Sequence, residues 1–159
     1  MEQQSKPPLP GLSIDKDVAA AIESVKAGNE IPFSLQIIDK SLQRVFALVV
    51  YDRTTLVIEN FDGLSTDERA LEWDRANSAY SAIAGTAARV NKALTEDKQT
   101  LQDGSNPDLD DQITLAFVQG RAALSKANPD DRLNVEIARE NIIVPLVRTY
   151  LIGVLREVQ

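Results

Sequence analysis

The longest uninterrupted helical pattern in the chain runs from Ser65 to residue 101, and it constrains the fold more than any other feature. Ser65 and Glu68 form an S-x-x-E capping box, which satisfies free amide groups at the start of a helix. Apolar residues then recur at heptad-like steps, and no proline or strong breaker appears before the Asp-Gly pair at 103–104. At 1.5 Å per residue the pattern predicts a rod of roughly 50 Å. We therefore expect one long central helix, about 66–101.

The middle of this helix, residues 76–88, is built almost wholly of small side chains. Small residues let a neighbouring helix approach closely, whereas Gly85 inside a helix otherwise costs about 1 kcal/mol relative to alanine. Either the stretch crosses another helix of the same chain, or it forms the seam of a homodimer. In the second case, the expected partner-binding residues are Trp73, Ala76, Tyr80, Ile83, Ala84, Gly85, Ala87, Val90 and Leu94.

The composition also favours helices. Hydrophobic residues make up 43% of the 159 residues but aromatics only 5%, so alanine and aliphatic side chains must fill the core. This length suits one domain with a single core. We expect a single helical domain over 13–159 after a flexible, proline-rich tail over 1–12. In that tail, Pro7 and Pro10 form a P-x-x-P pattern, which also occurs in polyproline II ligands.

Residues 31–63 allow two interpretations. A 3-4-3-4 spacing of apolar residues predicts one helical face, and Pro32 suits a first helical turn. The members of that face are Leu35, Ile38, Leu42, Val45 and Val49. The β-branched residues allow a small β-hairpin at about 44–61 instead, which would make the fold α+β. The helical spacing is the more regular, and a helix apolar nearly all round is expected to be a buried central element.

Three further helices complete an all-α bundle of four to five helices. The first spans 15–27 and stops at the Gly-Asn pair 28–29, and the second runs from 107 to about 126. The third runs from 129 to the C-terminus, and Pro145 should kink it because proline removes a helical hydrogen bond. Its expected core face consists of Leu133, Ile137, Leu151 and Leu155.

The triplet Asn-Pro-Asp occurs twice, at 106–108 and 128–130, 22 residues apart. Asparagine is a favoured N-cap, proline suits the first helical position, and aspartate in the opening turn complements the helix dipole. Both copies are therefore predicted to start helices rather than to bind a ligand.

Composition excludes several kinds of function. The chain has no histidine and no cysteine, which rules out zinc fingers, thiol nucleophiles, Ser-His-Asp triads and histidine-containing di-iron sites. A net charge of −7 without a basic run argues against nucleic-acid binding. The longest apolar stretch, 142–155, is too short to span a membrane, and no signal peptide opens the chain. We expect a cytoplasmic protein without membrane insertion. No phosphate-binding glycine motif indicates a nucleotide, and no cofactor is expected.

Two clusters of polar residues could carry chemistry. Asp103, Asp108, Asp110 and Asp111 are acidic neighbours, but counting from Asp103 or Asp108 does not produce the glycine and glutamate of a calcium EF-hand loop. Carboxylate pairs at helical spacing leave a magnesium-dependent helical enzyme as one alternative.

The second cluster surrounds the predicted kink at Pro145. It consists of Glu136, Arg139, Glu140, Arg148 and Tyr150. Such groups could line a small-molecule pocket, although exposed ion pairs along a helix are the commoner arrangement.

The expected function is a non-enzymatic helical protein-interaction module, such as an adaptor, regulator or assembly component, which binds another protein or itself as a homodimer. The unequal helix lengths motivate this expectation, since a rod longer than its neighbours leaves an apolar end exposed. A helical small-molecule sensor and the magnesium enzyme are the alternatives.

Overall fold

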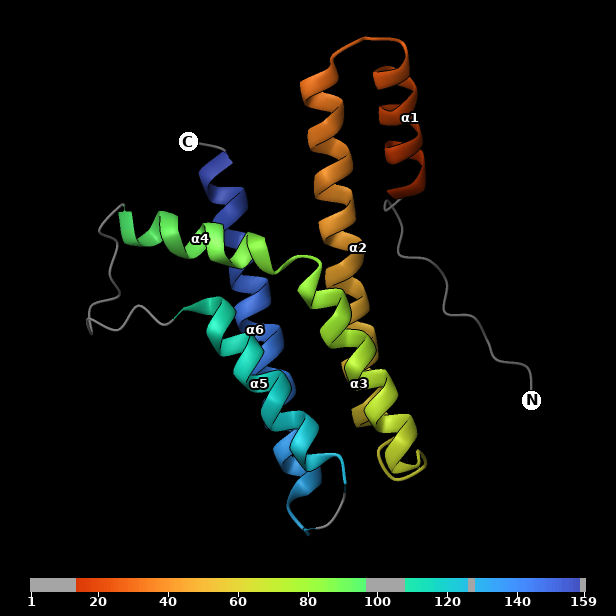
Figure 1. Cartoon of the computed structure of the whole chain (residues 1–159), viewed down its shortest axis with the longest axis vertical. Helices are drawn as coiled ribbons and strands as arrows, with labels where there is room; N and C mark the ends of the chain where they lie inside the picture. The colour runs from red at the N-terminus through yellow and green to blue at the C-terminus, as the bar shows by residue number, and fades with distance from the viewer. Residues whose placement is uncertain (1–13, 97–107, 126–127, 158–159) are drawn as a thin grey trace, which may run out of the picture. The chain divides into compact units, whose positions relative to one another are not determined.

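The structure is a computed structural model, and it describes residues 14–96, 108–125 and 128–157. Over these residues the chain forms six α-helices and no strand, so the all-α prediction is confirmed and the β-hairpin alternative is wrong (Figure 1). The helices are α1 (Ile14–Lys26), α2 (Ile31–Glu59), α3 (Thr66–Ser81), α4 (Ala84–Glu96), α5 (Leu109–Ala123) and α6 (Asp131–Glu157). The predicted tail lies outside the described residues.

The chain divides into two compact units, Met1–Val45 and Phe46–Gln159, and the boundary falls inside α2. In the first unit, α1 and the start of α2 form a helical hairpin. Gly28, with φ of 73°, supplies the left-handed turn that ends α1, as the sequence predicts. In the second unit, the rest of α2 is followed by α3, α5 and α6, which alternate in direction (Figure 1). That residues 13–159 form one domain stays a prediction.

The core of the second unit centres on a close contact between α3 and α5. The Trp73 indole lies against Gly120, where an added Cβ atom would come within 2.1 Å of the ring. Its Nε1 donates a hydrogen bond of 2.9 Å to the Phe117 carbonyl, and the Phe117 ring packs edge-on at 5.9 Å. Only glycine at position 120 lets the two helices approach this closely.

The predicted long helix is two helices, α3 and α4. The chain turns at Ala82 and Ile83, where the amide of Ile83 donates to the Tyr80 carbonyl at 2.8 Å in a tight three-residue turn. Just before the turn, the hydroxyls of Ser78 and Ser81 donate to carbonyls four residues back, an arrangement that bends helices. α4 leaves this turn in a different direction and contacts α5 and α6 (Figure 1).

The predicted capping box is confirmed at the start of α3. The Ser65 hydroxyl accepts from the Glu68 amide at 3.2 Å, and the Ser65 amide donates to the Glu68 carboxylate at 2.8 Å. The hydrogen bonds from Ser65, first its side chain and then its backbone, lower the pKa of Glu68 below its ordinary value.

The two Asn-Pro-Asp triplets do precede helices, but not in the predicted register. Asp108 is the N-cap of α5, and its carboxylate accepts from the amides of Asp110 and Asp111. α6 begins only at Asp131, so the second proline precedes the helix rather than opening it. Asn128 instead donates its amide to the Asp131 carboxylate at 2.9 Å. Asp108 therefore caps α5, and Asp131 accepts from the backbone of Asn128, while 106 and 107 lie outside the described residues.

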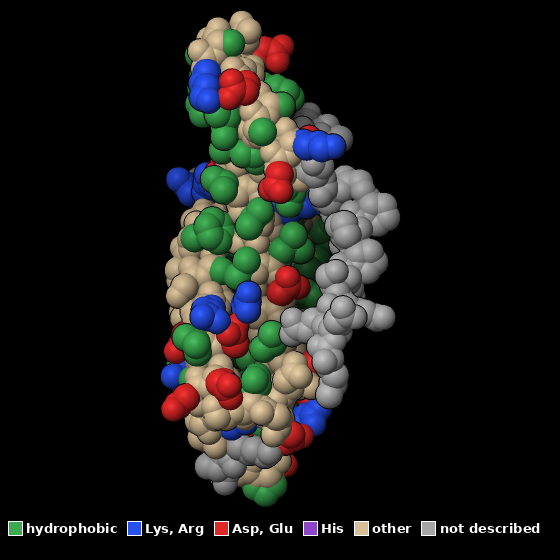
Figure 2. Space-filling model, turned by 90° about the vertical axis from the view of Figure 1, so that its right-hand side faces the viewer, with side chains coloured by type: hydrophobic (Ala, Val, Ile, Leu, Met, Phe, Trp, Pro, Cys, Tyr) green, Lys and Arg blue, Asp and Glu red, His purple; other side chains and the backbone are tan. Residues whose placement is uncertain are grey.

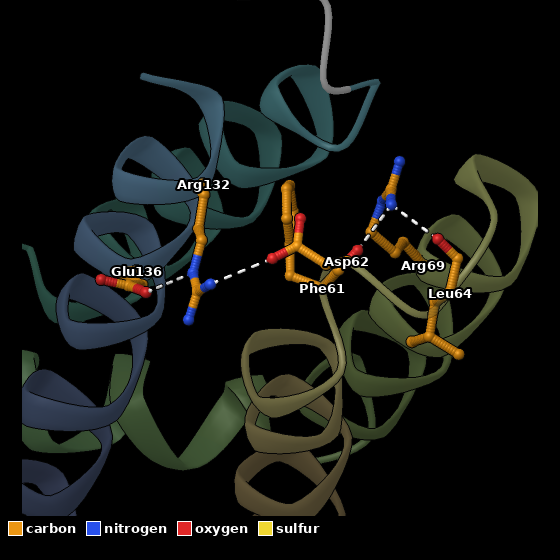
Figure 3. Close-up of polar contacts among 6 residues, drawn as sticks. All are labelled: Phe61, Asp62, Leu64, Arg69, Arg132 and Glu136. Atoms are coloured by element: carbon orange, nitrogen blue, oxygen red, sulfur yellow. Dashed lines mark hydrogen bonds and ion pairs between the residues drawn. The ribbon is translucent and has the colours of Figure 1, made fainter. Parts of the chain in front are cut away.

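One buried arginine, which no sequence motif singles out, ties the α2–α3 turn to the end of α5. Arg69 is 3% exposed and its guanidinium donates to the carbonyls of Phe61 at 2.7 Å and Leu64 at 2.6 Å (Figure 3). It also donates to the carbonyl of Leu124 at 2.9 Å. It also lies 4.6 Å from the centre of the Phe61 ring. These contacts satisfy a buried charge without a carboxylate, because carbonyl groups replace the lost water.

The same turn is linked to α6 by an exposed ion pair. Arg132 contacts Asp62 at 3.2 Å and Glu136 at 3.1 Å (Figure 3).

The core face of α2 is not the predicted one. Val50, Thr54 and Val57 are fully buried, and Phe61 in the following turn continues the same face. The regular apolar stripe predicted to face the core is partly or largely exposed, so the first half of α2 is not a buried central element. The helix is apolar on more than one side, and the contacts made by α3 and α6 decide which side becomes interior.

Candidate interaction surfaces

The predicted partner-binding residues lie mostly inside the chain's own core. Six of them are at most 7% exposed, namely Trp73, Ala76, Tyr80, Ile83, Ala87 and Val90. Ala84 is half-buried, Gly85 is exposed with open space where a Cβ would lie, and the Leu94 side chain is outside the described residues. The burial agrees with the alternative in which small residues pack within the chain. Partner binding at these residues stays a prediction.

The acidic residues around 108–111 serve the ends of helices. Asp108 caps α5, and the Tyr80 hydroxyl of α3 donates to the Asp110 carboxylate. Burial, followed by this bond and the surrounding negative charge, raises the pKa of Tyr80 above its ordinary value. Among the described residues, no group of three or more acidic side chains could hold a metal ion.

Three members of the predicted polar cluster on α6 form ion pairs, Glu136 with Arg132 and Arg139 with Glu140. Arg139 contacts Glu140 at 2.7 Å, donates to the Thr55 hydroxyl at 2.8 Å and lies 5.0 Å from the Tyr51 ring centre. Its Nε is buried without a hydrogen-bond partner.

Beside Arg139 is a shallow hollow of about 420 Å³ between α2 and α6. Its lining consists of Ile58, Glu136, Ile137, Arg139, Glu140 and Asn141, and each of these side chains is at least partly exposed. The hollow is therefore open to solvent, unlike the mostly enclosed pockets that hold small molecules.

The most regular apolar surface is on α6, on the side away from the core. We call it the outer face of α6, and it consists of Leu133, Ile137, Glu140, Val144, Val147 and Leu151. The five apolar members are between 50% and 60% exposed. Their 4-3-4-3-4 spacing is the a/d pattern of a coiled-coil seam. Glu140 is the one polar member, and Arg139 neutralises it.

The predicted core face of this helix is therefore wrong. Leu133, Ile137 and Leu151 belong to the outer face, and the Leu155 side chain is outside the described residues. The buried residues form what we call the inner face of α6: Val135, Ala138, Ile142, Leu146 and Thr149. At 100° per residue, the inner and outer faces lie on opposite sides of the helix.

The inner face continues through Pro145, where the Thr149 hydroxyl donates to the proline carbonyl at 3.0 Å. The kink at this proline stays a prediction.

A second exposed stripe lies in the first unit. We call Leu35, Ile38, Leu42 and Val45 the α2 stripe, and three of these are more than a third exposed. Between residues 14 and 45 the buried side chains are Ala21, Ser34 and Gln43. Figure 2, which views the side that carries α2, shows hydrophobic side chains at the surface between charged ones. A hairpin that buries so little leaves its apolar side chains available to another surface.

Comparison of the chain with known protein families, with curated proteins and with solved structures finds no match. Among the helices described, none combines the length and the apolar character needed to cross a bilayer. A functional assignment therefore depends on the chain's own surfaces.

Proposed function

We propose that the protein is a non-enzymatic helical protein-interaction module of the cytoplasm, an adaptor, regulator or assembly component that binds a helical partner through the outer face of α6. The observation that carries this proposal is the exposed heptad seam of that face. Five aliphatic side chains lie in one line on a helix whose opposite side already supplies the core.

The hydrophobic effect explains why such a face favours a partner. Each half-exposed aliphatic side chain leaves apolar surface in contact with water. Covering that surface with another apolar surface is favourable by about 25 cal/mol per Å² of apolar area removed from water. Isolated exposed aliphatics are normal on proteins, but a contiguous line of them marks an interaction site. The line extends from Leu133 to Leu151, about 27 Å along the helix at 1.5 Å per residue.

The α2 stripe of the first unit supports the same class of function independently. It repeats the three- and four-residue spacing of the outer face of α6, and the hairpin that carries it has few buried side chains. Two unpartnered apolar stripes suit a protein that connects other helical surfaces. We treat the α2 stripe as a second contact surface, and the outer face of α6 as the main one.

The hollow between α2 and α6 is the site that a small-molecule sensor would use. Because its lining side chains are partly exposed, it suits contact with a protein side chain better than enclosure of a ligand. Its position beside Ile137 lets a residue from a helix on the outer face enter it.

The proposal is tested by affinity capture from native lysate with three versions of the full chain. In Val144→Glu the outer face gains a second carboxylate, which we expect to abolish capture of the specific partner. Val118→Glu is the matched control, since Val118 is a similarly exposed valine, 64% against 60%, on α5. We expect the wild type and Val118→Glu to capture the same proteins, and Val144→Glu to lose them.

Two controls make the result decisive. Circular dichroism and thermal unfolding of both variants should match the wild type, because each substitution is on an exposed helix surface. If all three versions capture the same set of proteins, the outer face of α6 is not the binding surface and the proposal is overturned.

A further inference from the structure

We infer that the turn between α3 and α4 is a hinge, and that α4 exchanges between two positions. In the first, α4 packs on α5 and α6 as the structure shows, and in the second it continues α3 as one helix (Figure 1). The starting point is a conflict, because the local sequence pattern predicts one helix and the tertiary structure contains two. Such conflicts are expected where a protein is strained or functional. This hinge is independent of the outer face of α6.

The apolar stripe of α3 passes through the turn into α4 without a change of register. Its members follow one another at steps of three and four residues and are at most 7% exposed: Trp73, Ala76, Tyr80, Ile83, Ala87 and Val90. In a continuous helix, Ile83 would therefore stay on the side that carries Trp73 and Tyr80. Straightening the turn leaves the hinge residue facing the core and moves α4 away from α5 and α6.

The backbone of the turn contains no feature that forces a break. Ala82 has φ of −68° and ψ of −20°, in the right-handed helical region, and neither Ala82 nor Ile83 has a positive φ. The amides of Ile83 and Thr86 donate to carbonyls three residues back, at 2.8 and 2.9 Å. Bonds of this type occur at helix ends and at hinges. Continuing the helix replaces them with four-residue bonds and needs no passage through the left-handed region.

Few buried side chains hold α4 in its packed position. Ala87 and Val90, the buried residues described on α4, lie outside the central core cluster, by which we mean the connected buried side chains of α2, α3, α5 and α6. Gly85 is exposed, and an added Cβ would meet open space there. Because α4 is a helix in both positions, opening keeps its internal hydrogen bonds. Segments with few buried apolar contacts open at a lower free energy than the core.

The length of the chain after α4 permits the open position. The Tyr80 hydroxyl contacts Asp110 at the start of α5, so this part of α3 and the start of α5 lie together. In a continuous helix, Glu96 would be about 24 Å further along the axis than Tyr80, at 1.5 Å per residue. The chain from Glu96 to Asp108 can span up to about 40 Å when extended. α4 can therefore open without displacing α5.

A distance between two spin labels tests the hinge in the full chain. The chain has no cysteine, so Asp67→Cys on α3 and Arg89→Cys on α4, both exposed positions, carry the labels. In a continuous helix the two backbone positions are about 33 Å apart, and the bend in the packed position makes them closer. Pulsed electron paramagnetic resonance measures the distance distribution.

Three substitutions in the labelled protein give the result its meaning. Val90→Ala removes buried methyl groups of α4 and weakens the packed position. Val135→Ala is the matched control, since Val135 is a buried valine of the central core cluster. Ala84→Pro should hold α4 in the packed position. Proline suits the first residue of α4, but within a continuous helix it would clash with the Tyr80 carbonyl.

We expect the distance near 33 Å as a minor population in the wild type. Its ratio to the shorter distance should rise roughly tenfold in Val90→Ala, because the packed position loses the burial of about two methylene equivalents. The ratio should stay at the wild-type value in Val135→Ala, and the longer distance should be absent from Ala84→Pro. Circular dichroism checks that each labelled variant is folded.

Three results would overturn the hinge. The first is a single short distance in both the wild type and Val90→Ala, a comparison that does not depend on the proline variant. The second is an equal rise of the longer distance in Val90→Ala and Val135→Ala, which would show general loss of stability. The third is a broad distribution that persists in folded Ala84→Pro, which would show that α4 detaches without continuing α3.

Discussion

The two faces of α6 are both apolar and both regular, yet only one is covered. The inner face is at most 5% exposed and packs into the core with α2, α3 and α5, whereas the apolar members of the outer face are at least half exposed. The uncovered face has the larger side chains and the more regular heptad. Periodicity therefore shows that a helix side suits burial, but it does not show whether the covering surface comes from the same chain.

The α2 stripe shows the same relation in the first unit. Its regular spacing predicts a core face, but the fully buried residues of α2 are Val50, Thr54 and Val57, on another side. In α6 the core uses the less regular side, whereas the buried side of α2 is as regularly spaced as its exposed stripe. Under the proposed function, a partner surface is the physical reason for keeping a regular stripe exposed.

The largest expected effect comes from comparing one side-chain truncation on the inner face of α6 with one on the outer face. Ile142→Ala removes a fully buried side chain of the inner face and should lower the free energy of unfolding by about 2–5 kcal/mol. Val144→Ala on the outer face should change it by no more than about 0.5 kcal/mol in dilute protein. Urea unfolding followed by circular dichroism measures both.

Protein concentration sharpens this comparison. If the outer face binds a second copy, the urea concentration at the midpoint of wild-type unfolding should rise with protein concentration, since association stabilises the native state by mass action. The midpoint for Val144→Ala should rise less, and Ile142→Ala should keep the wild-type dependence. Equal losses of stability from the two alanine variants in dilute protein would contradict the assignment of inner and outer faces.

Gly120 and Gly85, both in helices, make a second matched pair: an added Cβ meets the Trp73 ring at Gly120 and open space at Gly85. Gly120→Ala drives a Cβ into the Trp73 ring and should destabilise the protein by about 1–3 kcal/mol through overpacking. Gly85→Ala meets open space, so it should stabilise α4 by up to about 1 kcal/mol through helix propensity. Thermal unfolding of the two variants should show melting temperatures that move in opposite directions. A loss of stability from Gly85→Ala would show that this position is covered.

The smallest expected effect on stability comes from a local contact at the start of α3, which does not involve the inner or outer face of α6. Ser65→Ala removes the capping box of α3 and should lower stability by about 1 kcal/mol at neutral pH. The pKa of Glu68 is lower in the folded protein than its ordinary value of 4.5. The ionised Glu68 therefore contributes to stability above pH 4.5, and this contribution is lost as the pH falls through the folded-state pKa.

The difference in free energy of unfolding between wild type and Ser65→Ala should therefore narrow as the pH falls below about 4.5, the ordinary pKa of the Glu68 carboxyl group. Unfolding curves at a series of pH values measure it. A difference that does not change with pH would show that the Glu68 carboxylate contributes nothing to the cap.

Features that depend on neighbouring residues were predictable from the sequence. The capping box at Ser65, the glycine stop at Gly28 and the helical reading of α2 are all confirmed, because each depends on hydrogen bonds or dihedral angles within a few residues. The Asn-Pro-Asp triplets mark the approach to α5 and α6. Their register differs in that Asp108 is itself the N-cap of α5, and α6 begins after the second triplet, at Asp131.

Features that depend on distant residues were not predictable. The break between α3 and α4 has only weak local signals, two serines and a glycine, in a stretch with otherwise strong helical pattern. Gly120 has no sequence signal, since its role depends on a tryptophan 47 positions away. Arg69 likewise resembles any charged residue in a first helical turn, although its partners include a carbonyl 55 residues further along.

By itself the sequence determined the helical class, most helix ends and the existence of several apolar stripes, because local hydrogen bonding and side-chain periodicity act within a few turns. Only the tertiary structure decided which stripes became core and which stayed exposed. A side chain becomes buried only when a second surface covers it. The spacing of apolar residues along one helix does not specify which surface that will be. For α6 the described part of this chain covers the inner face and leaves the apolar members of the outer face at least half exposed.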